Sequence, residues 1–192
     1  AADDKLVPGF ADVLGWRRPD LYADLLADHA DLPVAAMLGP APEDMPSKFL
    51  DVATLQVSWF HNQDWTVTRA VGQIEHAAKM GATFGVLPEL FCFRPGEVAK
   101  DPAAAAAYSA EVLVKLQAAC VANAFWLVVN LVESSDEGFH STAYLIDPSG
   151  GIRHTYRKTH LDTAEQAWAT AGNEIGVAVT EVGNIGIMIG NE

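Results

Sequence analysis

Three polar positions of this sequence could supply chemistry at one edge of a sheet. Glu89 directly follows a strand-like segment that ends in proline, Lys158 follows a hairpin strand, and residues 187–192 end the last strand-like segment. Ligands of open α/β sheets collect beyond the carboxyl ends of the strands. A carboxylate and an ammonium that converge there would suit general acid–base catalysis with stabilisation of an oxyanion. From the residues alone, the alternative is an ordinary surface ion pair.

The helices that would position these residues carry clear start and stop signals. Apolar residues at helical spacing over 66–80 predict a helix that stops at Gly81. Asp101 and Pro102 supply an N-cap and a first-turn proline for a second helix, which runs through an alanine-rich segment to about Ala124.

Short apolar runs around these helices predict the strands. They span residues 52–59, 83–87, 125–132, 141–146, 152–157, 177–180 and 185–189. The turn sequence at 148–151, Pro-Ser-Gly-Gly, joins two of them as a hairpin. Strand–helix–strand–helix–strand followed by a hairpin predicts an α/β sheet whose early strands are parallel and buried.

Composition narrows the class of function. The 192 residues are enough for one domain with its own core. The net charge is −13 and no basic cluster interrupts it, so we expect no nucleic-acid partner. The longest apolar runs, such as 125–132, are far shorter than the roughly 20 residues that span a bilayer, so we expect no membrane partner. Cys92 and Cys120 make neither a disulfide framework nor a metal-ligand pattern, so we expect no metal and a reducing, cytoplasmic location.

Residues 1–50 differ from the rest of the chain. Six of the ten prolines lie there, and apolar periodicity is weak apart from a short helix predicted around 19–29. We interpret 1–50 as an N-terminal extension or linker and 51–192 as the domain. The alternative for 1–50 is an arm that packs on the domain or on a neighbouring subunit. Because the chain stops directly after a strand with no helix to cover it, we expect it to be one part of a larger domain. The alanine start indicates processing or trimming, by which an upstream segment can be lost.

Three blocks in order carry a family resemblance. They are residues 85–91 around Glu89, residues 142–161 around Lys158, and the glycine-led segment 186–192. The sequence over 51–192 resembles the nitrilase superfamily of carbon–nitrogen hydrolases, in its amidase and carbamoyl-amide-like branch. The resemblance implies a four-layer α-β-β-α sandwich, here truncated after the nucleophile strand.

The resemblance also implies a cofactor-independent mechanism on a small-molecule amide, in a homo-oligomer that is a dimer or larger. Glu89 would be the general base, Lys158 would hold the oxyanion of the tetrahedral intermediate, and a cysteine would attack the carbonyl carbon. This chain departs from the family at the cysteine position, which is Gly190. Three explanations stay open: an engineered or artefactual loss of the nucleophile, a naturally inactive homologue kept for binding or assembly, and a fragment of a processed chain.

Neither cysteine of the chain is expected to replace the missing nucleophile. Cys92 lies between phenylalanines and is expected in the core, and Cys120 lies in the middle of the alanine-rich helix. Many family members also have a second glutamate soon after the lysine. Counted without gaps, that position falls at Gln166; Glu165 takes the role if the spacing shifts by one residue, and is otherwise an exposed loop carboxylate.

Three residues are predicted to contact substrate: Phe91, Trp168 and Asn191. Nitrile-hydrolysing members of the family usually carry tryptophan where this chain has Asn191, which favours an amide over a nitrile. Residues 91–97 are expected to shape the pocket. Rival functions stay open: a nitrile-hydrolysing member, a silent nitrilase-like binding or assembly module, and an unrelated ligand-binding α/β domain. In the last of these, the charged ends of Glu89 and Lys158 would lie far apart.

Overall fold

The computed structural model describes residues 50–59, 62–190 and 192. Residues 1–49, with the helix predicted at 19–29, lie outside the described residues, and so does Asn191. Residues from Leu50 onward form one compact unit.

Both predicted helices are confirmed, each with a capped N-terminus. Helix α4 (Gln63–Lys79) begins after Asn62, whose side chain accepts a hydrogen bond of 2.9 Å from the backbone N–H of Trp65. Helix α5 (Pro102–Asn123) begins after Asp101, whose carboxylate accepts one of 2.9 Å from Ala104. Each cap acts within the first turn of its helix, and α4 begins at Gln63 rather than at residue 66.

Five strands form the main sheet, in the order β1-β2-β3-β4-β5. The first three pair in parallel and the last two form the hairpin, both as predicted; the antiparallel pairing of β3 with β4 was not predicted. Their bounds are Val52–Thr54 (β1), Phe84–Val86 (β2), Trp126–Ser135 (β3), Gly138–Ile146 (β4) and Ile152–Arg157 (β5). Two short 3-10 helices, η2 (Val98–Lys100) and η3 (Glu165–Ala167), lie in the connections.

The first and the last predicted strand differ most from the structure. The run 52–59 forms a strand only over its first three residues, at the edge of the sheet, and Val52 is 55% exposed rather than buried. The last run forms β7 (Gly183–Gly186), which pairs only with β6 (Val177–Thr180) in a separate two-stranded sheet. Residues 187–189 therefore continue without a ladder partner. The segment that leads to Gly190 is not a strand.

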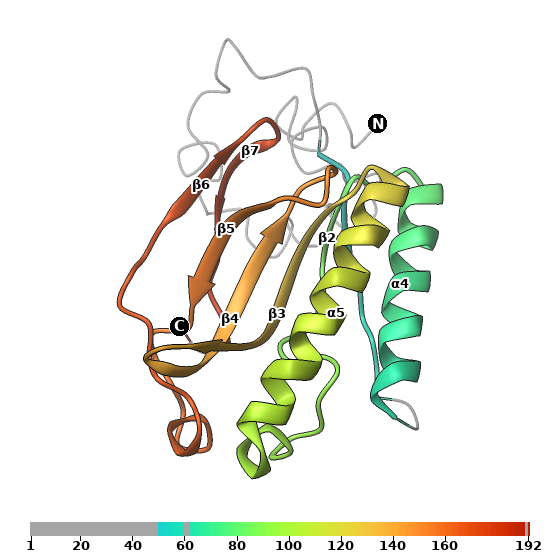
Figure 1. Ribbon diagram of the computed structural model, residues 1–192. Helices are drawn as coiled ribbons and strands as arrows, with labels where there is room; N and C mark the ends of the chain where they lie inside the picture. Colours follow the sequence, from blue (N-terminus) through green and yellow to red (C-terminus); the bar gives the residue numbers. More distant parts are fainter. Residues whose placement is uncertain (1–49, 60–61, 191) are drawn as a thin grey trace, which may run out of the picture. The chain divides into compact units, whose positions relative to one another are not determined.

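The sheet has a different core on each face. Helices α4 and α5 lie side by side along one face (Figure 1), where Leu127, Val129 and Leu131 of β3 join the first core cluster. On the other face, Trp126 of β3 packs in a second cluster that includes Ile187 and Ile189. The fold is thus mixed α/β, with β3 central to both cores.

Helix α5 is the one described helix long and apolar enough to cross a membrane by length and composition, with a mean hydropathy of 1.2. The sequence reasoning considered only shorter runs and missed this feature. In the structure, Val112, Leu116 and Cys120 of α5 are fully buried in the first core cluster. A core helix passes the same test, so α5 is weak evidence for a membrane.

Candidate active site

The strand that leads to Glu89 ends in a strained turn. The parallel ladder between β2 and β3 continues to Leu87, whose N–H donates to the carbonyl of Val128 over 3.0 Å. Pro88 has no N–H to continue it. Leu90 then adopts a left-handed backbone with φ of 44°, which a residue with a side chain rarely does. This turn directs the Glu89 side chain out of the sheet, where it is 37% exposed.

Lys158 meets Glu89 from the end of β5. Its backbone N–H donates to the carbonyl of Ser141 on β4 over 2.9 Å, which extends the hairpin ladder by one residue. Its side chain is only 3% exposed, and Nζ donates to Glu89 Oε1 over 2.8 Å. The two charged ends thus converge although 69 positions separate them in sequence. This geometry contradicts the alternatives of a surface pair and of charged ends that lie far apart.

Glu165 is the second carboxylate on Lys158, and it is buried rather than exposed. Lys158 Nζ donates to Glu165 Oε1 over 2.8 Å. Glu165 and Asp162 hold each other reciprocally, because each backbone N–H donates to the other's carboxylate. Gln166 is exposed and donates to the carbonyl of Leu161 instead. Glu165, one residue before the ungapped position, is therefore the carboxylate that bonds to Lys158. The alternative that Glu165 is an exposed loop carboxylate is wrong.

The two carboxylates keep Lys158 charged. Burial alone would lower the pKa of its ammonium, but the hydrogen bonds to Glu165 and Glu89 outweigh burial and raise the pKa above its ordinary value. A donor that stays protonated and a carboxylate open to solvent are two of the groups that acyl transfer uses, besides a nucleophile.

Gly190 lies directly against this cluster. Its φ is +64°, in the left-handed region that favours glycine. A Cβ built on it would lie 2.9 Å from Lys158 Nζ and 3.2 Å from Glu89 Oε2. A side chain at position 190 would therefore point between the carboxylate and the ammonium.

Glu192 holds the Gly190 segment against the Lys158 segment, and sequence reasoning missed it. Its Oε2 accepts from the backbone N–H of Ile189 over 2.9 Å and from the hydroxyl of Tyr156 over 2.7 Å. Its Oε1 accepts from both the backbone N–H and the hydroxyl of Thr159 over 2.7 Å, and from the N–H of His160 over 3.0 Å. Burial would raise the pKa of this carboxyl, but these hydrogen bonds lower it to about 2. An acidic residue two positions after Gly190 was the signal that could have found it.

A sequence model of the family described as carbon–nitrogen hydrolase matches residues 51–192. The chain belongs to the carbon–nitrogen hydrolase family. This is the nitrilase superfamily that the three motifs predicted.

Solved structures share the fold of this carbon–nitrogen hydrolase chain. A carbon–nitrogen hydrolase from Helicobacter pylori G27 is 22% identical, with a TM-score of 0.67 over 72% of this chain and 50% of that one. The NitN amidase of Nesterenkonia sp. AN1 is 19% identical, with a TM-score of 0.66 over 73% of this chain and 56% of that one. A mutant of that amidase in complex with butyramide is 19% identical, with a TM-score of 0.65 over 72% and 55%. The chain thus spans about half the length of these structures. No curated protein sequence matches it.

Two of the residues predicted to contact substrate, Phe91 and Trp168, lie in or against the core. Phe91 is buried in the first core cluster, and Trp168 packs against that same cluster. Asn191 lies outside the described residues. None of the three has a described contact with Glu89 or Lys158, so their roles stay predictions.

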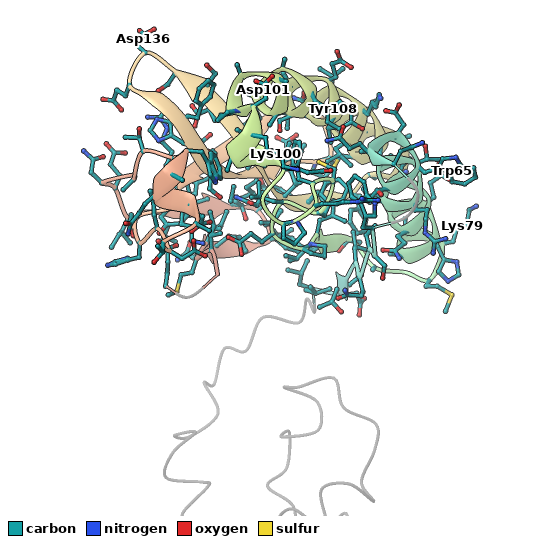
Figure 2. All side chains as sticks on the ribbon, turned by 90° about the horizontal axis from the view of Figure 1, so that it is seen from below. Trp65, Lys79, Lys100, Asp101, Tyr108 and Asp136 are labelled. Atoms are coloured by element: carbon teal, nitrogen blue, oxygen red, sulfur yellow. The ribbon has the colours of Figure 1, made fainter. Side chains whose placement is uncertain are left out.

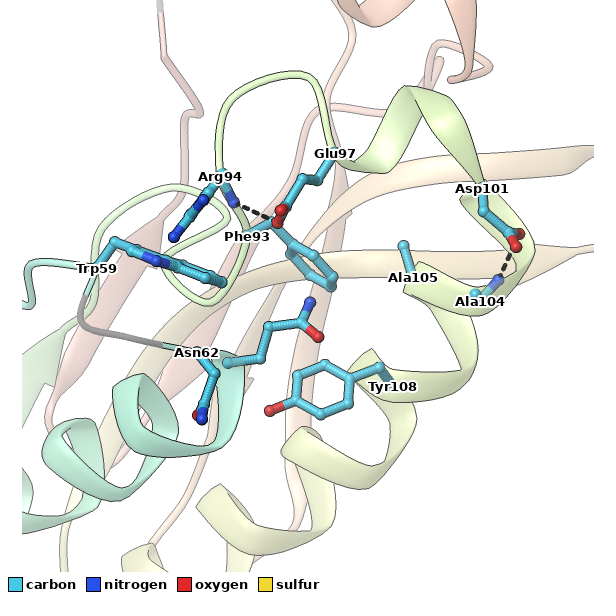
Figure 3. A pocket seen from close by; sticks show the side chains of 10 residues that line it. Trp59, Asn62, Phe93, Arg94, Glu97, Asp101, Ala104, Ala105 and Tyr108 are labelled. Atoms are coloured by element: carbon cyan, nitrogen blue, oxygen red, sulfur yellow. Dashed lines mark hydrogen bonds between the residues drawn. The ribbon is translucent and has the colours of Figure 1, made fainter.

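The loop after Glu89 lines a cavity that is separate from Glu89 and Lys158, so the role of residues 91–97 in the substrate pocket stays a prediction. This cavity of about 440 Å³ lies at the N-termini of α4 and α5. Figure 3 shows Phe93 and Tyr108 on its wall, and the Arg94 guanidinium stacks 4.9 Å from the ring centre of Trp59. Its lining residues are Trp59, Asn62, Gln63, Phe93, Arg94, Glu97, Asp101, Ala104, Ala105 and Tyr108. Neither Glu89 nor Lys158 is among them.

Both thiols are unsuited to replace the missing nucleophile. Cys92 and Cys120 are fully buried, and burial raises the pKa of each thiol to about 12. A thiol needs to ionise to attack, so both stay unreactive near neutral pH. Across 50–59, 62–190 and 192, no group of three His, Cys, Asp or Glu side chains could hold a metal ion.

Proposed function

We propose that the Glu89–Lys158–Glu165 cluster is the amide-hydrolysing site of a carbon–nitrogen hydrolase whose nucleophile position is Gly190. One observation carries the proposal: a Cβ at position 190 would lie within 3.2 Å of both the Lys158 ammonium and the Glu89 carboxylate. A cysteine there would have its base and its oxyanion donor as neighbours once the Lys158 ammonium shifts to admit the Cβ.

Each residue has one task in the proposed reaction. With cysteine at position 190, Glu89 takes the thiol proton and the thiolate attacks the amide carbonyl carbon. Lys158 donates to the resulting oxyanion, and Glu165 keeps Lys158 charged and in place. The C–N bond breaks as Glu89 returns the proton to the leaving ammonia, which leaves a thioester. Glu89 then activates a water that hydrolyses the thioester, so that the products are a carboxylic acid and ammonia. The chain with Gly190 cannot form the thioester.

Small non-peptide amides are the substrates that we propose. One mutant of the Nesterenkonia amidase was solved in complex with butyramide, and another shows Michael addition of acrylamide at the active-site cysteine. Asn191, in place of the tryptophan usual in nitrile-hydrolysing members, favours the amide as well. Butyramide and a simple carbamoyl compound are therefore the first probes.

The test is to install the thiol. We expect Gly190→Cys to release ammonia from butyramide or a carbamoyl compound and to show an acyl adduct by mass spectrometry, whereas the unaltered chain does neither. Adding Glu89→Gln or Lys158→Met to Gly190→Cys should abolish both signals. Adding Cys92→Ala should leave both intact, because Cys92 is buried in the core.

A catalytically inactive ligand-binding module is the second candidate. It is favoured by the absence of a thiol at position 190 and by the left-handed φ of Gly190. If Gly190→Cys folds and its thiol is alkylated by iodoacetamide, yet no amide is hydrolysed, this candidate replaces the first. Titration of butyramide into the unaltered chain needs no variant. NMR shifts confined to Glu89 and Lys158 support a substrate site, and no shifts at the solubility limit of butyramide contradict both candidates.

Self-association also remains a proposal. Ile175, Val177 and Val179 in and before β6 are exposed, and so is Met188 after β7. Apolar patches of this kind favour protein contacts. Light scattering of the purified chain should give a mass of two subunits or more, and a monomer at micromolar concentration would contradict this.

A further inference from the structure

Asn130 is a buried polar residue in the middle of the most apolar strand of the protein. It lies on β3, where its neighbours Val129 and Leu131 are fully buried, and it is itself only 5% exposed. A buried amide costs free energy unless its donors and acceptor are satisfied. The hydrogen bonds of the Asn130 side chain therefore indicate its structural role.

The carbonyl oxygen of Asn130 holds the turn that presents Glu89. Oδ1 accepts from the backbone N–H of Leu90 over 3.0 Å. Leu90 is the residue with the left-handed backbone, immediately after Glu89. Pro88 ends the backbone ladder between β2 and β3, and the Asn130 side chain supplies the next acceptor on β3. This bond offsets the strain of the turn.

The amide nitrogen of Asn130 reaches toward Lys158. Nδ2 donates to Ser141 Oγ over 3.1 Å, and Ser141 is 1% exposed. The carbonyl of Ser141 in turn accepts from the backbone N–H of Lys158 over 2.9 Å. The Asn130 side chain thus contacts the turn that carries Glu89 directly. It contacts the strand end that carries Lys158 through Ser141.

We propose that Asn130 is a positioning residue, which fixes Glu89 relative to Lys158 by bonding to Leu90 on one side and to Ser141 on the other. It does not contact the reacting atoms itself. The expected effect of Asn130 on turnover rests on the proposed function. The expected effect of Asn130 on the geometry of the cluster does not.

Turnover in the Gly190→Cys background is the first readout. Adding Asn130→Ala should lower kcat about 10- to 100-fold, the usual effect of misplacing a catalytic group by about 1 Å, with KM changed less than about threefold. Adding Ser141→Ala removes only one of the two connections and should give an intermediate loss. Val129→Ala is the matched control: it removes buried volume at the next position of β3, on the helix side, and should cost stability while leaving kcat unchanged.

Titration of Lys158 in the chain with Gly190 is the second readout and needs no activity. Asn130→Ala should lower the pKa of the Lys158 ammonium, measured by NMR, because its contact with Glu89 loosens, and Val129→Ala should not. If Gly190→Cys is inactive while the Lys158 titration responds to Asn130→Ala, the proposed function fails and the positioning role stands. If Asn130→Ala and Val129→Ala give the same Lys158 titration, and the same kcat where turnover exists, the positioning role is wrong.

Discussion

The carboxylate of Glu192 accepts a hydrogen bond of 2.7 Å from the backbone N–H of Thr159. This bond joins the segment that follows Gly190 to the segment that follows Lys158. The same carboxylate accepts from Ile189, directly before Gly190. Glu192 therefore fixes the two halves of the site to each other, and its side chain is only 4% exposed.

Replacing this carboxylate should destabilise the site and the domain together. Glu192→Gln keeps the size of the side chain but turns one acceptor oxygen into a donor, which faces other donors. We expect a loss of about 1–3 kcal/mol in the free energy of unfolding, measured by urea denaturation. Asp136→Asn is the control, since Asp136 is an exposed turn residue (Figure 2) and should give no measurable change. Equal effects of the two changes would contradict the role of Glu192.

The same carboxylate should make stability depend on acid pH. Its pKa falls from an ordinary 4.5 to about 2 in the folded chain, so the unfolded chain binds the proton more readily. Its contribution is complete above about pH 4.5 and is lost as the pH falls toward 2. Glu133 and Asp147 also have lowered pKa values and act in the same direction. The test is the difference in the free energy of unfolding between the unaltered chain and Glu192→Gln, measured from pH 6 to pH 2. We expect this difference to shrink below pH 4.5. A difference that stays constant would show that Glu192 is not involved.

Local signals in the sequence predicted the frame that carries the site. The caps Asn62 and Asp101 act within their own helix turns, so the start of α5 follows from a few residues. The last strand was mispredicted because apolar alternation at 185–189 reports burial, not pairing. Ile187 and Ile189 are indeed buried in the second core, but no strand pairs with them.

The fine geometry of the site depends on contacts distant in sequence. Glu165, rather than Gln166, reaches Lys158 because the reciprocal bonds with Asp162 orient its short 3-10 helix. Asn130 is hidden in an apolar run, and its partner Leu90 is 40 positions away. Motif spacing can indicate which acid and amine meet, but not which buried side chains hold them.

Removing the buried ammonium should leave two carboxylates facing each other. We expect Lys158→Met to lose about 3–5 kcal/mol of stability at pH 7, as in other buried pairs with one partner removed. Glu89 and Glu165 would then repel each other without a cation between them. Urea unfolding at pH 7 measures this. Lys115→Met is the control, because the ion pair of Lys115 with Asp64 is 3.8 Å long and exposed. A variant that loses no more than this control would contradict the pairing.

The last prediction concerns the cost of any side chain at position 190. Gly190→Ala places a Cβ on a left-handed backbone with φ of +64° and 2.9 Å from Lys158 Nζ, so we expect a loss of about 1–3 kcal/mol. Gly72→Ala is the matched control: this glycine lies in helix α4 with no atom within 4 Å of the added Cβ, and alanine should stabilise it by about 0.5–1 kcal/mol. Thermal unfolding of the two variants should therefore shift in opposite directions. If Gly190→Ala is neutral, the left-handed backbone at this position is not enforced by the fold, and the thiol of Gly190→Cys need not point between Glu89 and Lys158.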